Sequence, residues 1–79
     1  MNIGDKFHSD INGGIEVTVI DTYYCGEHGN TERTLLICVG NGLLLKFSET
    51  TIYKAGEIIV EPPKYEGCVE IIENLKDYE

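Results

Sequence analysis

The chain has 79 residues, enough for one domain with a small core and little room for an elaborate active site. Fourteen acidic residues against six basic ones give a net charge of −8, which argues against direct binding of nucleic-acid phosphates or anionic membranes. Hydrophobic residues make up 42% of the chain, so we expect a folded domain rather than a disordered acidic tail.

The first half of the chain reads as strands separated by glycine-rich turns. Residues 6–9 predict a short strand with Phe7 pointing inward, and a turn over 10–14 leads into a longer strand over 15–24. Apolar and polar residues alternate along this second strand until the pattern slips at Ile20. The slip predicts a bulge or sharp bend, by which one strand serves two sheets in a small barrel.

The second half is predicted to hold three further strands and one helical turn. In chain order we expect a polar loop over 26–32, a strand over 34–39, a tight turn at Gly40-Asn41-Gly42, a strand over 43–47, a helical turn over 48–52 capped by Ser48, and a strand over 57–61 closed by Pro62-Pro63.

The C-terminal segment, residues 64–79, favours an amphipathic helix. Val69, Ile72 and Leu75 recur at steps of three, which is typical of the buried side of a helix. A sixth strand over 69–72 is the alternative, because short apolar runs are poorly resolved by pattern alone.

The order of elements from Lys6 to Glu61 resembles that of an SH3-like small β-barrel. The resemblance implies a mainly β fold of about five strands with a C-terminal helix or sixth strand. With the length of the chain, we expect one domain over 1–79, with the barrel over 3–61 and an acidic segment over 64–79. The layout resembles small domains encoded by phages and mobile elements of Gram-positive bacteria, but it is topological and carries over no functional residues.

Two of the predicted strands, over 35–39 and 43–45, are apolar on both faces. A half-buried strand should alternate, so the second face, including Leu36, Cys38 and Leu44, needs a cover. Either the C-terminal segment or a second copy of the chain can supply it. Cys38 itself reads as a small buried hydrophobic residue.

Cysteine and histidine spacing gives only weak support for a metal site. Cys25 and His28 have the C-x-x-H spacing of half a zinc site, whereas Cys38, Cys68 and His8 are single residues without paired spacing. A plain hairpin loop is the alternative interpretation, and we expect no cofactor. No catalytic motif or phosphate-binding loop is found, so we do not expect an enzyme.

The three cysteines cannot all pair within one chain, and residues 1–5 do not resemble a signal peptide. Reduced thiols without a secretion signal are typical of the cytoplasm, so we expect a cytoplasmic protein. No apolar run is long enough to span a membrane.

Acidic residues concentrate at the C-terminal end, where residues 57–79 hold seven acids and two lysines. If this segment is helical, four acids at steps of four, three and four form one negative stripe: Glu66, Glu70, Glu73 and Asp77. A solvated helix face that keeps the protein soluble is the simpler interpretation. The more specific interpretation is that these acids form a surface that imitates nucleic-acid charge and occupies a basic groove on another protein.

Five tyrosines and no tryptophan make tyrosine the main aromatic residue available for contacts. Tyr65 and Tyr78 flank the acidic stripe and are candidates for partner contact. Tyr23 and Tyr24 are adjacent on a predicted strand, so at least one should be exposed. Each tyrosine can equally be a half-buried edge residue.

These observations favour a small acidic interaction protein. The resemblance implies a phage or mobile-element inhibitor that binds a basic surface on a host protein, blocking an enzyme or defence complex. One alternative is a homo-oligomer that captures a small ligand such as a nucleotide signal. Another is a zinc-stabilised binding module that uses Cys25 and His28.

Overall fold

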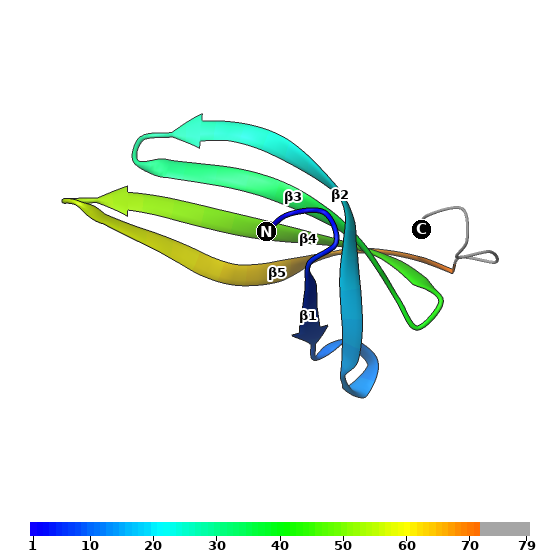
Figure 1. Cartoon of the computed structure of the whole chain (residues 1–79). Helices are drawn as coiled ribbons and strands as arrows, with labels where there is room; N and C mark the ends of the chain where they lie inside the picture. The colour runs from blue at the N-terminus through cyan, green and yellow to red at the C-terminus, as the bar shows by residue number, and fades with distance from the viewer. Residues whose placement is uncertain (72–79) are drawn as a thin grey trace.

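The computed structural model describes the backbone of residues 1–71 and the side chains of residues 1–67. The described chain forms one five-stranded antiparallel sheet, curled into a half-barrel, in which each strand pairs with its neighbours in sequence (Figure 1). The mainly β, five-stranded fold expected from the sequence is thereby confirmed. The elements are β1 (Lys6–Ser9), the 3-10 turn η1 (Ile11–Gly13), β2 (Ile15–His28), β3 (Thr31–Gly40), β4 (Leu43–Lys54) and β5 (Glu57–Ile71).

The bend predicted at Ile20 lies in the middle of β2. Val19 pairs with Cys38 and Asp21 pairs with Ile37, which leaves Ile20 as the extra residue of a bulge. Before the bulge β2 pairs with β1, and beyond it β2 runs with β3 towards their shared hairpin (Figure 1). The predicted bulge is therefore confirmed, whereas the two sheets that the bent strand was expected to serve are one continuous five-stranded sheet in the described chain.

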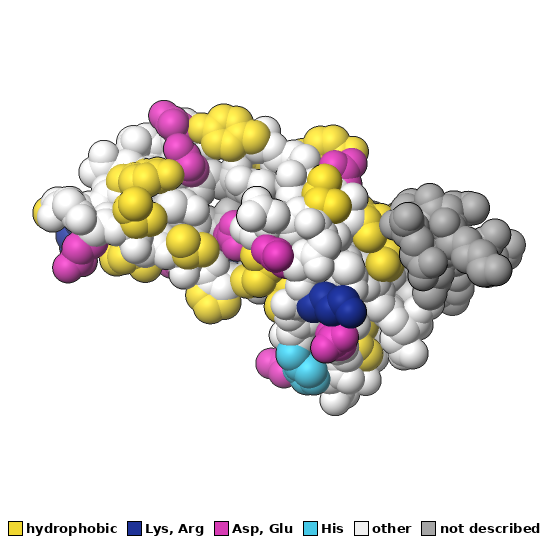
Figure 2. Space-filling view, in the orientation of Figure 1, with side chains coloured by type: hydrophobic (Ala, Val, Ile, Leu, Met, Phe, Trp, Pro, Cys, Tyr) yellow, Lys and Arg dark blue, Asp and Glu magenta, His cyan; other side chains and the backbone are white. Residues whose placement is uncertain are grey.

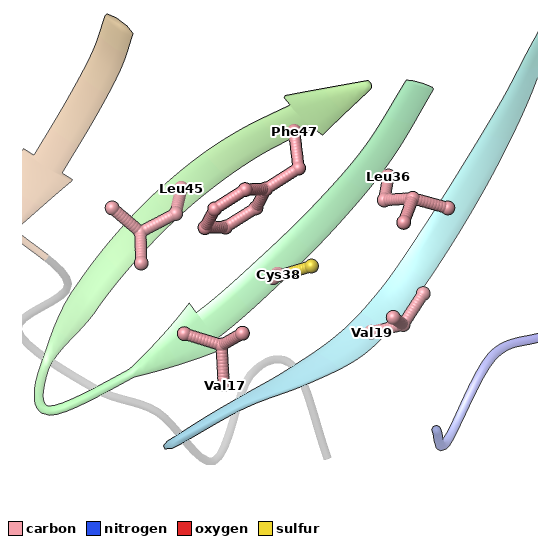
Figure 3. Close-up of a cluster of buried hydrophobic side chains, with 6 residues drawn as sticks. All are labelled: Val17, Val19, Leu36, Cys38, Leu45 and Phe47. Atoms are coloured by element: carbon pink, nitrogen blue, oxygen red, sulfur yellow. The ribbon is translucent and has the colours of Figure 1, made fainter. Parts of the chain in front are cut away.

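The core lies on the inner face of β2, β3 and β4 (Figure 3). Phe7 of β1 packs edge-on against Phe47, with ring centroids 5.0 Å apart, as its predicted inward orientation requires. Six side chains are almost fully buried: Val17, Val19, Leu36, Cys38, Leu45 and Phe47.

The prediction for the second apolar face named two wrong residues. Leu36 and Cys38 belong to the core face, because they pair with the buried Phe47 and Leu45. The opposite face includes Leu44, paired with Val39, and both are only partly exposed. Residues 72–79, one of the predicted covers, lie outside the described residues.

The helical turn predicted over 48–52 is wrong, because this segment is part of β4. Thr50, Thr51 and Ile52 favour strand, since their branched side chains fit a pleated surface. Ladder partners on both sides, Thr31 of β3 and Ile59 of β5 for Ile52, complete the backbone pairing. Ser48 is consequently a buried strand residue rather than a helix cap.

The fifth strand does not end at Pro62-Pro63 as predicted. The register between β4 and β5 shifts between Ser48 and Thr50, opposite the prolines. Backbone pairing is therefore interrupted at the two prolines and resumes at Lys64. β5 is an edge strand, where a missing N–H on the free side costs no ladder bond.

The C-terminal helix is not found over 64–71, where β5 continues to Ile71 and pairs with Leu43. Over 69–71 the chain is strand, as the alternative predicted, but these residues continue β5 and do not form a sixth strand. The remainder of the predicted helix, 72–79, lies outside the described residues. Among residues 1–71, the structure has no helix with the length and apolarity needed to cross a membrane.

The polar loop predicted over 26–32 is much shorter in the structure. β2 continues to His28 and β3 starts at Thr31, so only Gly29 and Asn30 form the turn. The β4–β5 turn lies beside it, because the Tyr53 amide donates to the Asn30 carbonyl over 2.7 Å. The ends of two hairpins therefore form one continuous end of the sheet.

Candidate interaction surface

The inner face of the sheet continues from the core to the ends of the β2–β3 and β4–β5 hairpins. Glu27 pairs with Glu32, Glu32 with Thr51, and Thr51 with Val60, and residues paired in this way share a face. Strand alternation and the bulge at Cys25 add three more side chains to this face. We define the tip face by six residues: Tyr24, Glu27, Glu32, Tyr53, Ile58 and Val60.

The tip face exposes large apolar side chains next to one another. Tyr24 is 61% exposed, Tyr53 41%, Ile58 69% and Val60 55%. Tyr53 and Ile58 are a cross-strand pair, so the exposed groups are contiguous. Figure 2 shows hydrophobic and acidic side chains interspersed over the hairpin end of the molecule. A contiguous apolar patch bordered by charge is typical of an interaction site.

The electrostatics of the tip face are dominated by two carboxylates. The Tyr53 hydroxyl donates a hydrogen bond of 2.9 Å to Glu32, and this bond is the main reason why the pKa of Tyr53 is raised. The pKa of Tyr24 is raised by desolvation first and then by the charges of Glu27 and Glu32. Both tyrosines therefore lie in a negative local potential and stay protonated at neutral pH.

No basic side chain of the described residues neutralises these two carboxylates. The ion pairs within residues 1–67 join Met1 to Glu49, Arg33 to Glu66, and Lys64 to Glu61, and none involves Glu27 or Glu32. Arg33, the single arginine, lies on the opposite face of β3 and contacts Glu66. The tip face is consequently apolar and negatively charged.

The residues that the sequence predicted for partner binding lie elsewhere. Tyr65 pairs with Phe47, and their rings, 6.0 Å apart, place Tyr65 at the edge of the core. Glu66 is held by Arg33. The helical stripe is wrong for Glu66 and Glu70, because both lie in β5, where Glu70 pairs with Leu44. The other predicted residues, Glu73, Asp77 and Tyr78, lie outside the described residues.

The half zinc site lies at the end of β2. Cys25 is exposed at the second β2 bulge, and its thiol donates to the Tyr23 carbonyl over 3.6 Å. His28 is the exposed last residue of the strand. In the part of the chain that the structure describes, no three His, Cys, Asp or Glu side chains are grouped as a metal ion would need.

A separate cavity of about 480 Å³ opens between the edge strands β1 and β5. Phe7, Ile11 and Phe47 line one part of it, and Pro62 and Tyr65 line another. These two edge strands are not paired in the described chain, so the half-barrel is open here. The cavity is separate from the tip face and has the concave shape of a small-ligand site.

Sequence reasoning identified only part of the tip face. It predicted that Tyr23 or Tyr24 is exposed, and both are. It missed Ile58 and Val60, although the apolar run Ile58-Ile59-Val60 in a predicted last strand was a usable signal of two apolar faces. Comparisons with protein-family models, curated proteins and solved structures found no match to this chain. The functional argument therefore rests on the geometry.

Proposed function

We propose that the protein is a small interaction module that binds a protein partner with a basic surface. The observation that carries the proposal is the tip face, which combines exposed apolar side chains with acids that no described basic residue pairs. Apolar contact area supplies affinity, whereas complementary charge raises the association rate and selects the partner.

The net charge of −8 supports the same class of partner. A protein with this charge is steered towards basic surfaces and away from nucleic acid, and this steering weakens as salt increases. Inhibition of a host enzyme or defence complex is the form of this function that the phage-like layout of an SH3-like barrel suggests. Imitation of nucleic-acid charge is then the means by which the protein occupies a basic groove.

The proposal is tested by capture from an extract of cells that naturally produce the protein. Immobilised protein and an unrelated acidic protein of similar size are compared at about 0.05 M and 0.5 M salt. We expect a basic protein that is retained only by this chain, is released by high salt, and loses activity when the chain is added. Equal retention by the unrelated acidic protein contradicts a specific interaction function.

The cavity between β1 and β5 supports a second candidate, capture of a small apolar or aromatic ligand. Phe7, Phe47 and Tyr65 offer aromatic walls, and the lining includes His8 and Asp10 but no lysine or arginine, which disfavours a phosphate-rich ligand. Native mass spectrometry decides between the candidates. Extra mass that survives desalting supports ligand capture, and a ligand-free protein contradicts it.

A further inference from the structure

We propose that the tip face is the docking surface and that its occupant is an extended segment of a partner protein bearing lysine or arginine. A cationic side chain of that segment lies between Tyr24 and Tyr53, against Glu27 and Glu32. This inference rests on the proposed function and adds the surface and the chemistry of the partner. Glu66, Glu70 and the other acids of the C-terminal segment are not needed for it.

The first argument is the carboxylate pair. Glu27 and Glu32 are directly opposite each other in the β2–β3 ladder, and like charges at such positions destabilise a sheet. Their position at the open end of the hairpin leaves the surroundings accessible to a partner. A partner cation between them converts this repulsion into attraction, so binding and relief of repulsion are coupled.

The second argument is the pair of aromatic side chains. The faces of tyrosine rings attract lysine and arginine, most strongly where water is excluded. Tyr53 is anchored by its hydrogen bond to Glu32, which restricts the ring before a partner arrives. Tyr24 is exposed on the same face and is close enough for its pKa to respond to Tyr53. Tyrosine and carboxylate groups thus surround one position suited to a cation.

The third argument concerns the shape of the occupant. β5 is an edge strand in the described sheet, and its first residues, Glu57 to Glu61, precede the prolines. An extended segment that enters over this edge and crosses the tip face can place apolar side chains against Ile58 and Val60 and its cationic side chain further in, against Glu27 and Glu32.

Charge excludes a second copy of this chain as the occupant. Two identical tip faces would bring Glu27 and Glu32 of each copy against those of the other, within a pair of chains each carrying −8. A basic partner segment removes the same repulsion. Charge complementarity therefore selects the partner rather than the homodimer.

The test uses a peptide of alternating glycine and lysine, with alternating glycine and glutamate as the control peptide. Titration of isotope-labelled protein, followed by amide NMR shifts, should place the largest changes at Tyr24, Glu27, Glu32 and Tyr53. The double variant Glu27→Gln/Glu32→Gln should weaken lysine-peptide binding by at least about tenfold. Tyr24→Ala should weaken it about fivefold with no change in charge.

A matched variant separates the local effect from net charge. Asp10→Asn/Glu16→Gln removes the same two negative charges from exposed positions at the β1 end of the sheet. We expect it to alter affinity by less than about twofold. Equal losses from the two double variants, or shift changes distributed over all acids, would overturn the inference.

The partner captured from the cell extract distinguishes this inference from the proposed function. If Glu27→Gln/Glu32→Gln abolishes its capture, both are supported. If the double variant and Tyr24→Ala capture it as well as the original chain does, the interaction function stands and the tip-face inference is wrong. If the original chain captures no specific partner, the proposed function is wrong even where the lysine peptide binds.

Discussion

Gly40, at the end of β3, is where the sheet has the least room for a side chain. A Cβ atom added there would lie 2.6 Å from the Glu16 carbonyl oxygen and 2.7 Å from Cγ1 of Val17. Both neighbours belong to β2, and Val17 is fully buried in the core. Gly40→Ala therefore forces β2 and β3 apart at the point where the half-barrel curls.

The expected cost follows from this geometry. Overpacking a well-packed site typically costs about 1–3 kcal/mol, and contact with a backbone oxygen favours the upper end because no side chain can rotate away. A chain of this length has a total stability of roughly 4–12 kcal/mol. A loss of about 3 kcal/mol should lower the melting temperature by roughly 12–24 °C for a domain of this size.

Thermal and urea unfolding, followed by circular dichroism, measure the effect. Gly29→Ala is the matched control, because Gly29 has a φ of +64° and no atom within 4 Å of an added Cβ. We expect it to cost only the left-handed backbone penalty of about 1–2 kcal/mol. A Gly40→Ala protein that melts within a few degrees of the original chain, or above Gly29→Ala, would refute the packing argument.

Three further predictions concern a thiol, a turn and a tyrosine. Burial raises the pKa of Cys38 to about 12, so its thiol should remain unreactive in the native protein at pH 9. Peptide mass spectrometry should then find that an alkylating reagent modifies exposed Cys25 in the native protein and Cys38 only after unfolding. Ala55 has a φ of +47° in the β4–β5 turn, so Ala55→Gly should raise stability by about 1 kcal/mol in urea unfolding. Glu32→Gln removes the charged acceptor of the Tyr53 hydroxyl, so the pKa of Tyr53 should fall towards 10 in an NMR titration, and an unchanged value would contradict the hydrogen bond.

The pattern of local residues predicted that each of the first four strands exists, although β2 and β3 extend into the predicted loop and β4 extends through the predicted helical turn. The slip at Ile20 marked the bulge because period-two alternation cannot change phase without an extra residue. Asn41-Gly42 marked the tight hairpin, and both residues have the positive φ that such a turn requires. These features depend on neighbours in sequence, which a single chain displays directly.

The errors arose where pairing partners decide the structure. Val69 and Ile71 have the spacing of a strand, and Val69 and Ile72 have the spacing of a helix, so the pattern alone fits both. The strand forms because the edge of β4 has free backbone groups with which residues 69–71 pair. Pro62 and Pro63 wrongly predicted the end of the last strand. An edge strand tolerates proline on its free side, and the sequence pattern cannot show which strand lies at an edge. The tip face was missed because Glu27 and Tyr53 come together only through the register of three strands.

Hydrogen–deuterium exchange of the protein with and without its captured partner tests the central claim most directly. Binding at the tip face predicts slower exchange in residues 22–34 and 52–60, with residues 6–14 unchanged. Protection of residues 6–14 and 62–65 instead would place the partner at the cavity between β1 and β5. Protection confined to residues 66–79 would return the interaction to the acidic C-terminal segment, and either result would contradict the account.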